Sequence, residues 1–320
     1  MIIYFGKINL CSNQIYDVLE KKSNLSVILL DLEKCFVDGL VYEDQYFENI
    51  EGVDTLETTK YTMHIISKYD SIVEGYIFKD AVIHYKKYNE CQKVFEWHQV
   101  KSDESVNFYF DVQSEMVGYT TANRFGFKEF LNVFQGIINQ GLENADSEFR
   151  FTVDAYCEGI NIKNIKNELK NLTNIQLLRF SYQPPNGMEI DMDELEDETD
   201  ALIGRYKGAN ISKKTVLLES MGPLGINLDS EEVTDLLNET CINGTIDTVN
   251  TTKYGYAQVE ATDANGRRFT TAEEKQVKKE IKNLIDFSDA CRKVISKRKT
   301  QSDNNDSEPK MQRDNDEGKK

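Results

Sequence analysis

The sequence predicts an α+β fold: a mixed sheet with strand–helix alternation in the central part, followed by a long C-terminal helix and a disordered tail. Residues 106–270 alternate between strand-like and helix-like patterns, and residues 61–97 carry the Tyr, Ile, Val and Phe typical of antiparallel strands. The predicted organisation is an N-terminal β-rich lobe or subdomain at 1–105, an α+β core domain at 106–270, a C-terminal helix at 271–300 and a tail at 301–320.

The N-terminal lobe begins with a short strand and a helix. Residues 2–9 are mostly apolar, as in a strand, and residues 13–21 carry apolar side chains at helical spacing. Residues 25–32 are apolar enough for a buried strand. The stretch at 61–97 follows, and its alternating pattern predicts an antiparallel, β-rich section.

The core domain opens with a β-β-α unit. Its strands are expected at 106–112 and 116–119, and its amphipathic helix at 127–138. Beyond it we expect strands at 149–155, 175–182 and 215–219, helices at 162–172, 192–203 and 229–237, and a hairpin with an Asn-Gly turn at 254–270. The order of elements at 149–220 is typical of a ferredoxin-like half.

The C-terminal part is predicted to be one helix and a tail. Thr271 and Glu274 have the spacing of a capping box, so we expect the helix to begin at Thr271 and to continue through Ile295. Residues 301–320 contain almost no apolar side chain, and they therefore cannot bury enough surface to become ordered.

The chain is strongly acidic. It has 320 residues, with 38 Lys and Arg against 55 Asp and Glu, and a formal net charge of −17. Such a chain is repelled by phosphate backbones and anionic lipid, so any nucleic-acid contact must use a local basic patch. No apolar run approaches the roughly 20 residues that span a bilayer, and no secretory signal is evident. We therefore expect a cytoplasmic protein with no membrane contact.

Strong catalytic motifs are missing from the sequence. Met221-Gly222-Pro223-Leu224-Gly225 lacks the Gly-Lys-Ser/Thr ending of a phosphate loop, and no Gly-x-Ser-x-Gly elbow occurs. The six cysteines are widely spaced, which indicates buried free thiols. We expect no cofactor, and the sequence favours a protein that is not an enzyme.

An acidic run extends from Glu189 to Asp200. Its carboxylates could hold Mg²⁺ or Mn²⁺ for phosphodiester hydrolysis, and the residues to test first are Asp191, Asp193 and Asp197. The alternative is an acidic helix surface that faces water or a partner, because acidic residues at a helix N-terminus also complement the helix dipole.

Two basic elements are candidates for nucleic-acid contacts, since aromatic rings can stack on bases while Arg binds phosphate. The candidate residues are Lys253, Tyr254, Tyr256, Arg267 and Arg268 in the late hairpin, and Arg292, Lys293, Lys297 and Arg298 in the last helix. Both elements also have a simpler interpretation, because Tyr is an ordinary strand residue and cations stabilise a helix C-terminus.

Three parts of this pattern resemble certain uncharacterised bacterial proteins of phage-defence loci. They are the hairpin and helix at 106–138, the Gln183-Pro184-Pro185-Asn186-Gly187 stop, and the late hairpin with Gly255-Tyr256 and Gly266-Arg267-Arg268. The resemblance covers roughly residues 100–270 and includes no catalytic motif. It implies a cytoplasmic defence component, and it assigns no site residue.

The function expected is therefore a non-catalytic binding or regulatory component of an intracellular prokaryotic antiviral or toxin-type system. It would engage a protein partner or nucleic acid, in an oligomeric state that the sequence leaves open. One alternative is a divalent-metal-dependent nuclease. The other is an acidic nucleic-acid mimic that inhibits a DNA-binding partner, because a row of carboxylates can imitate phosphate spacing.

Overall fold

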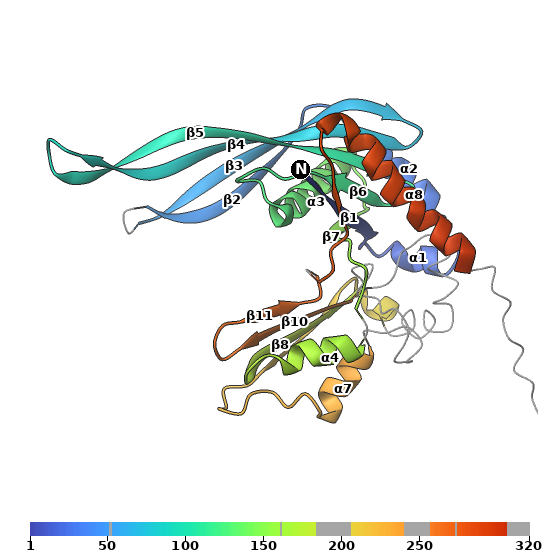
Figure 1. Ribbon diagram of the computed structural model, residues 1–320. Coiled ribbons are helices and arrows are strands. Elements are labelled where there is room, and N and C mark those ends of the chain that lie inside the picture. Colours follow the sequence, from blue (N-terminus) through green and yellow to red (C-terminus); the bar gives the residue numbers. More distant parts are fainter. Residues whose placement is uncertain (51–52, 161, 184–205, 240–256, 273, 306–320) are drawn as a thin grey trace, which may run out of the picture.

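The protein folds around two antiparallel sheets of different size (Figure 1). The computed structural model describes residues 1–50, 53–160, 162–183, 206–239, 257–272 and 274–305. The large sheet has eight strands in the order β12-β1-β6-β5-β4-β3-β2, with β7 also paired to β1. Its strands are β1 (Ile2–Leu10), β2 (Leu40–Ile50), β3 (Val53–Tyr69), β4 (Ile72–Asn89), β5 (Val94–Asp111), β6 (Met116–Tyr119), β7 (Phe151–Ala155) and β12 (Lys278–Glu280).

Strand β1 organises the large sheet. One of its edges pairs with β6, while the other pairs first with β12, with Ile2 opposite Glu280, and then with β7, with Lys7 opposite Asp154. The ammonium group of Met1 also donates a hydrogen bond to the carbonyl oxygen of Ile281. Segments from the beginning, middle and end of the sequence therefore meet on one strand.

Helices cover both faces of the large sheet. These are α1 (Ile15–Leu19), α2 (Leu25–Lys34) and α3 (Phe127–Asn144) on one face and α8 (Phe287–Asn305) on the other. Phe130 of α3 stacks on Tyr119 of β6, with 4.0 Å between ring centroids. On the opposite face, Cys291 and Ile295 of α8 pack in a second apolar cluster with Ile3.

The small sheet has the order β11-β10-β8-β9 and its own apolar core. Its strands are β8 (Ile175–Tyr182), β9 (Lys214–Glu219), β10 (Ala257–Asp263) and β11 (Arg268–Thr270). Two helices, α4 (Ile162–Lys170) and α7 (Glu231–Asn238), cover this sheet. Short 3-10 helices lie before β9, at η1 (Lys207–Ala209), and before α8, at η3 (Leu284–Asp286). Ile165 of α4 and Leu237 of α7 are fully buried in this core.

The α+β class is confirmed, but the sheets differ from the mixed sheet that was expected. Every strand pair among the described residues is antiparallel. β7 pairs with β1 in the large sheet, so it cannot join β8 in a ferredoxin-like half. The expected domain boundary between residues 105 and 106 falls inside β5, which is hydrogen-bonded to β4 along its whole length.

Residues 25–32 form helix α2, not the expected strand. The Asn24 side chain caps the helix by accepting a hydrogen bond from the Ser26 amide at 2.9 Å. Ile28, Leu29 and Leu32 then lie on one buried face. A short apolar run alone could not distinguish these two structures.

The C-terminal helix begins later than the capping-box pattern predicts. The hydroxyl of Thr271 accepts a hydrogen bond from the Val259 amide at 3.0 Å, so it does not cap a helix. Residues 278–280 form edge strand β12 beside β1, and α8 begins at Phe287. Because α8 extends to Asn305, the first five residues of the predicted tail are helical, and the rest of that tail lies outside the described residues.

Candidate functional site

The large sheet splits into two hairpins at one end (Figure 1). β4 pairs with β3 only as far as Asp80, opposite Lys60, and from there continues with β5 alone. We call residues 81–102 the β4–β5 ribbon. β2 and β3 likewise continue as a separate pair, from Asp44 opposite Thr59 to Ile50 opposite Val53.

A side-chain turn sets the register of the β4–β5 ribbon. The carboxamide oxygen of Asn89 accepts hydrogen bonds from the backbone amides of Cys91 at 3.0 Å and Gln92 at 3.2 Å. Lys93 completes the turn with a φ of 56°. The closed turn places Asn89 opposite Val94 and fixes every pair behind it.

One face of the β4–β5 ribbon combines aromatic and basic side chains. Lys86 lies opposite Trp97, and its Nζ is 4.9 Å from the ring centroid. Tyr88 lies opposite Phe95, with 5.2 Å between their ring centroids. Since side chains alternate between faces, these four residues share a face with four more. We call this set the aromatic face: Val82, His84, Lys86, Tyr88, Phe95, Trp97, Gln99 and Lys101.

Most of the aromatic face is exposed, and His84 and Trp97 are half-buried. Phe95 keeps 66% of its surface accessible and Tyr88 keeps 48%, and none of the three apolar cores includes a residue of the ribbon. Phe95 and Tyr88 therefore form an exposed apolar pair, and the half-buried Trp97 follows on the same face. The opposite face is less aromatic, with Tyr85 stacked on His98 and Lys87 opposite Glu96.

The charge of the ribbon opposes that of the whole chain. Residues 81–102 contain four lysines, two glutamates and no aspartate, whereas the chain carries a formal −17. Glu96 lies opposite Lys87 on the other face and Glu90 lies in the turn, whereas the aromatic face carries Lys86 and Lys101. Within the ribbon this face is therefore cationic, and the next pair on the same side, Asp80 opposite Asp103, is acidic.

A small polar pocket of about 120 Å³ lies at the base of the ribbon, and Lys79 and Arg124 are among the residues that line it. The Nζ of Lys79 lies 2.7 Å from the Glu129 carboxylate, and the backbone amide of Arg124 donates to Glu104 at 2.7 Å. Tyr61 also donates to Glu129, and burial together with this bond raises the Tyr61 pKa. Lys79, Glu104 and Arg124 are thus engaged within the protein, and these contacts connect the root of the ribbon to the body.

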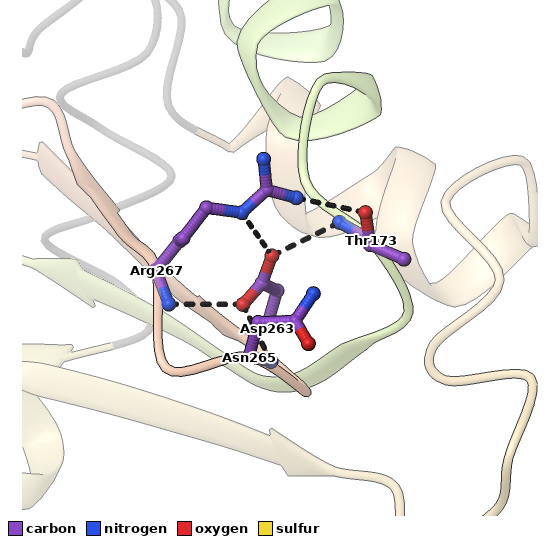
Figure 2. Close-up of polar contacts among 4 residues, drawn as sticks. All are labelled: Thr173, Asp263, Asn265 and Arg267. Atoms are coloured by element: carbon purple, nitrogen blue, oxygen red, sulfur yellow. Dashed lines mark hydrogen bonds and ion pairs between the residues drawn. The ribbon is translucent and has the colours of Figure 1, made fainter.

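Arg267, one of the predicted phosphate-binding residues, is engaged within the protein (Figure 2). Its Nε lies 2.7 Å from the buried carboxylate of Asp263, and its Nη2 donates to the Thr173 hydroxyl at 2.8 Å. The same carboxylate accepts the backbone amides of Thr173, Asn265 and Arg267. Burial alone would raise the Asp263 pKa, but these hydrogen bonds outweigh it and lower the pKa to about 2. Arg267 therefore closes the β10–β11 turn against the loop before β8.

The other predicted basic residues are not brought together. Arg268 is exposed on β11 of the small sheet, whereas Lys293 and Lys297 are exposed on α8 over the large sheet. Arg292 donates to the Tyr69 hydroxyl at 3.1 Å. The side chain of Arg298, the hairpin residues Lys253, Tyr254 and Tyr256, and the carboxylates Asp191, Asp193 and Asp197 lie outside what the structure describes.

A polar cluster lies where the two sheets meet. Asp154 of β7 accepts hydrogen bonds from Gln258 at 2.9 Å and from Asn9, Thr152 and Gln183 at 3.4 Å. Asn9 lies on β1 and Thr152 on β7 of the large sheet. Gln258 lies on β10 of the small sheet, and Gln183 directly follows β8. Burial raises the Asp154 pKa despite nearby Lys213 and these donors.

The thiols near this junction are held in the protonated form. Burial, with the Asp154 charge as a second cause, raises the pKa of Cys11 to about 11 and that of Cys157 to about 12. A thiol with so high a pKa is a poor nucleophile at neutral pH.

Among the described residues, no group of three or more His, Cys, Asp or Glu side chains is arranged to hold a metal ion. Nor does the described part of the chain contain a helix with the length and apolarity to cross a membrane.

Comparison with known families assigns the chain. The model of a family described as a domain of unknown function, DUF4747, matches residues 42–289, well over half of the sequence. The chain therefore belongs to the DUF4747 family. The region matched to DUF4747 includes the whole β4–β5 ribbon and the small sheet. Comparison with curated proteins and with solved structures gives no match.

Proposed function

We propose that this protein is a non-catalytic nucleic-acid-binding component, and that the aromatic face of the β4–β5 ribbon is its binding surface. The observation that carries the proposal is the placement of Lys86 over Trp97 beside the Tyr88–Phe95 pair on one exposed face. Rings that stack on bases beside cations that contact phosphate form the recognition mode of proteins that bind nucleic acid without sequence preference.

Charge supports this choice of ligand. The chain as a whole repels a polyanion, so a bound strand is favoured only at a local cationic site. The ribbon projects from the body of the large sheet (Figure 1). The aromatic face itself carries no carboxylate, and the first acidic pair on the same side, Asp80 opposite Asp103, lies at the root of the ribbon.

The test is binding of a fluorescently labelled oligonucleotide, followed by anisotropy across a series of salt concentrations. For Lys86→Ala/Lys101→Ala, we expect weaker binding and a salt slope shallower by about 1.4, since each phosphate contact on a single strand contributes about 0.7. The matched control is Lys163→Ala/Lys166→Ala on α4, which removes the same charge from the small sheet. Equal losses in both variants would mean that only net charge matters, and no loss in either would reject the ribbon as the site.

The biological setting belongs to the same proposal. We propose that the protein acts in the cytoplasm as part of an antiviral or toxin-type system, with a protein partner, as the sequence resemblance implies. Phage plating on cells with the wild-type gene or the Lys86→Ala/Lys101→Ala gene tests this setting, with equal plaque counts as the contradicting result.

The two alternative functions, a Mg²⁺- or Mn²⁺-dependent nuclease and an acidic nucleic-acid mimic, stay predictions. Cleavage assays of Asp191→Asn, Asp193→Asn and Asp197→Asn test the nuclease.

A further inference from the structure

We infer that the strand bound by the ribbon is single-stranded nucleic acid, with unpaired bases stacking on the rings of Phe95 and Trp97. This inference rests on the proposed function and specifies its ligand. The structure supplies three arguments for it: the exposure of Phe95 beside the half-buried Trp97, the spacing of the two rings along β5, and the position of Lys86.

The first argument is access. A ring can stack only on the face of a base, and in a duplex those faces are covered by neighbouring base pairs. The Phe95 side chain is exposed and Trp97 follows two residues later on the same face. The polar side chains that read base edges in a duplex groove are mainly Arg, Lys, Asn and Gln. The ribbon carries Lys86, Gln99 and Lys101 on this face, and it also presents rings toward its turn end.

The second argument is spacing. Two residues along a strand cover about 6.8 Å, so Phe95 and Trp97 present rings at about that separation. Successive bases in a stacked duplex strand are only about 3.4 Å apart. Bases that sit on both rings must therefore be unstacked from each other, as they are in an extended single strand. The nine residues from Ala81 to Asn89 extend about 30 Å, which gives such a strand a continuous track.

The third argument concerns Lys86. Its ammonium group lies 4.9 Å from the Trp97 ring centroid in the free protein, where the ring is the available partner. A base that stacks on Trp97 brings its phosphate to the same side of the ribbon, and the flexible Lys86 side chain can reach that phosphate. Lys86 thus covers the ring in the free protein and contacts the backbone of the strand in the complex.

Trp97 makes the inference directly measurable, because it is the only tryptophan in the chain. Its fluorescence reports changes in the surroundings of this one ring. The full-length protein is titrated with a mixed-sequence DNA of about 15 nucleotides, the RNA of the same sequence, and the corresponding DNA duplex. We expect both single strands to quench Trp97 and to bind more tightly than the duplex.

The outcomes separate the inference from the proposed function. Duplex binding that equals or exceeds single-strand binding, without quenching, would overturn the single-strand inference and leave nucleic-acid binding intact. No binding of any of the three probes at low salt would overturn the proposed function as well.

Ring variants give a second, independent readout by anisotropy. We expect Phe95→Ser to bind about 5- to 100-fold more weakly and Trp97→Ala to show a similar loss, with Trp97→Phe close to wild type because it keeps a ring. The matched control is Tyr85→Ala, which removes a ring from the opposite face of the same ribbon. Equal loss in Tyr85→Ala and Phe95→Ser would contradict a site on the aromatic face.

Discussion

Two aspartates show how the surroundings of a carboxyl group decide its protonation. Asp263 is surrounded by donors, and hydrogen bonds from three backbone amides and the Arg267 guanidinium hold its pKa at about 2 although burial opposes them. Asp154 also accepts several hydrogen bonds, yet burial dominates and raises its pKa. The two groups therefore influence stability in opposite directions as the pH changes.

Replacing Asp263 with Asn should destabilise the fold at neutral pH. The amide would point donors toward Arg267 Nε and the Thr173 amide, which already donate there. Because the folded-state pKa is lowered, the carboxylate's contribution is present above pH 4 or so and is lost as the pH falls toward about 2. Urea unfolding of both proteins from neutral to acidic pH measures the difference, which should shrink with acidification.

The same experiment separates a structural role of Arg267 from a binding role. Arg267→Ala should lower the urea midpoint and leave oligonucleotide affinity unchanged, because its guanidinium is engaged by Asp263 and Thr173. Arg268→Ala is the matched control, since Arg268 is exposed beside it. Lost affinity with an unchanged midpoint in Arg267→Ala would restore the late hairpin as a candidate site.

Replacing Asp154 with Asn should flatten the pH dependence of stability. With the folded-state pKa raised, the unfolded chain loses its proton first, above about pH 4, while the folded protein keeps it. The free energy of unfolding of the wild type should therefore fall as the pH rises through this window, and then remain lower. Asp154→Asn lacks this fall, and Asp103→Asn at an exposed position of β5 should retain it. Parallel profiles for Asp154→Asn and the wild type would reject the assignment.

At the level of elements, the sequence pattern of the ribbon predicts its strands but not how those strands pair. The alternation of residues 61–97 correctly predicts antiparallel strands, because period two describes any strand with two distinct faces. It does not say which strand lies alongside, so it could not show that β4 leaves β3 at Asp80. The pairing of Lys86 with Trp97 depends on the register set by Asn89. The sequence signal that could have indicated this site is the concentration of Tyr and Lys residues near Trp97.

The predicted C-terminal helix shows the opposite case, in which a local motif competes with long-range pairing. Thr271 and Glu274 match a capping box, but residues 278–280 gain more by pairing with the edge of β1. The pairing partner, β1, lies at the other end of the sequence, so the local pattern around Lys278 does not predict it. The hairpins at 106–119 and 257–270 were predictable because both of their strands are adjacent in the sequence.

Removing the outer ribbon should abolish binding and leave the fold intact. The variant lacks residues 84–99 and joins Ile83 to Val100 through an Asn-Gly turn. Since no ribbon residue belongs to an apolar core, we expect an unchanged thermal midpoint and no measurable affinity for a labelled single strand. A lowered midpoint would show that the ribbon stabilises the body, and retained affinity would place the site elsewhere.

At the scale of the whole molecule, the described residues form two bodies with separate cores. The core of the small sheet shares no residue with the two clusters of the large sheet, and the Asp154 cluster connects the sheets through polar contacts. Polar interfaces between domains couple their unfolding weakly. This division crosses the sequence, because the small sheet lies between β7 and β12 of the large one.

Calorimetry should therefore record two unfolding transitions. Leu178→Ala, in the core of the small sheet, should destabilise one of them by about 2–5 kcal/mol, as expected for a fully buried leucine. Phe134→Leu, under the large sheet, should shift only the other. A single transition that both substitutions shift equally would show that the two bodies unfold as one.

The pairing of β1 with strands from later in the chain has a consequence for biosynthesis. A ribosome releases β1 first, yet its edge partner β12 and the covering helix α8 follow only after the small sheet has been made. Until then Ile3, Phe5 and Tyr109 have no α8 to cover them, and a nascent chain with an open strand edge and an apolar face is prone to aggregation. Slower translation would lengthen that exposure, so yield in the cell should depend on chaperones that shield the unfinished sheet.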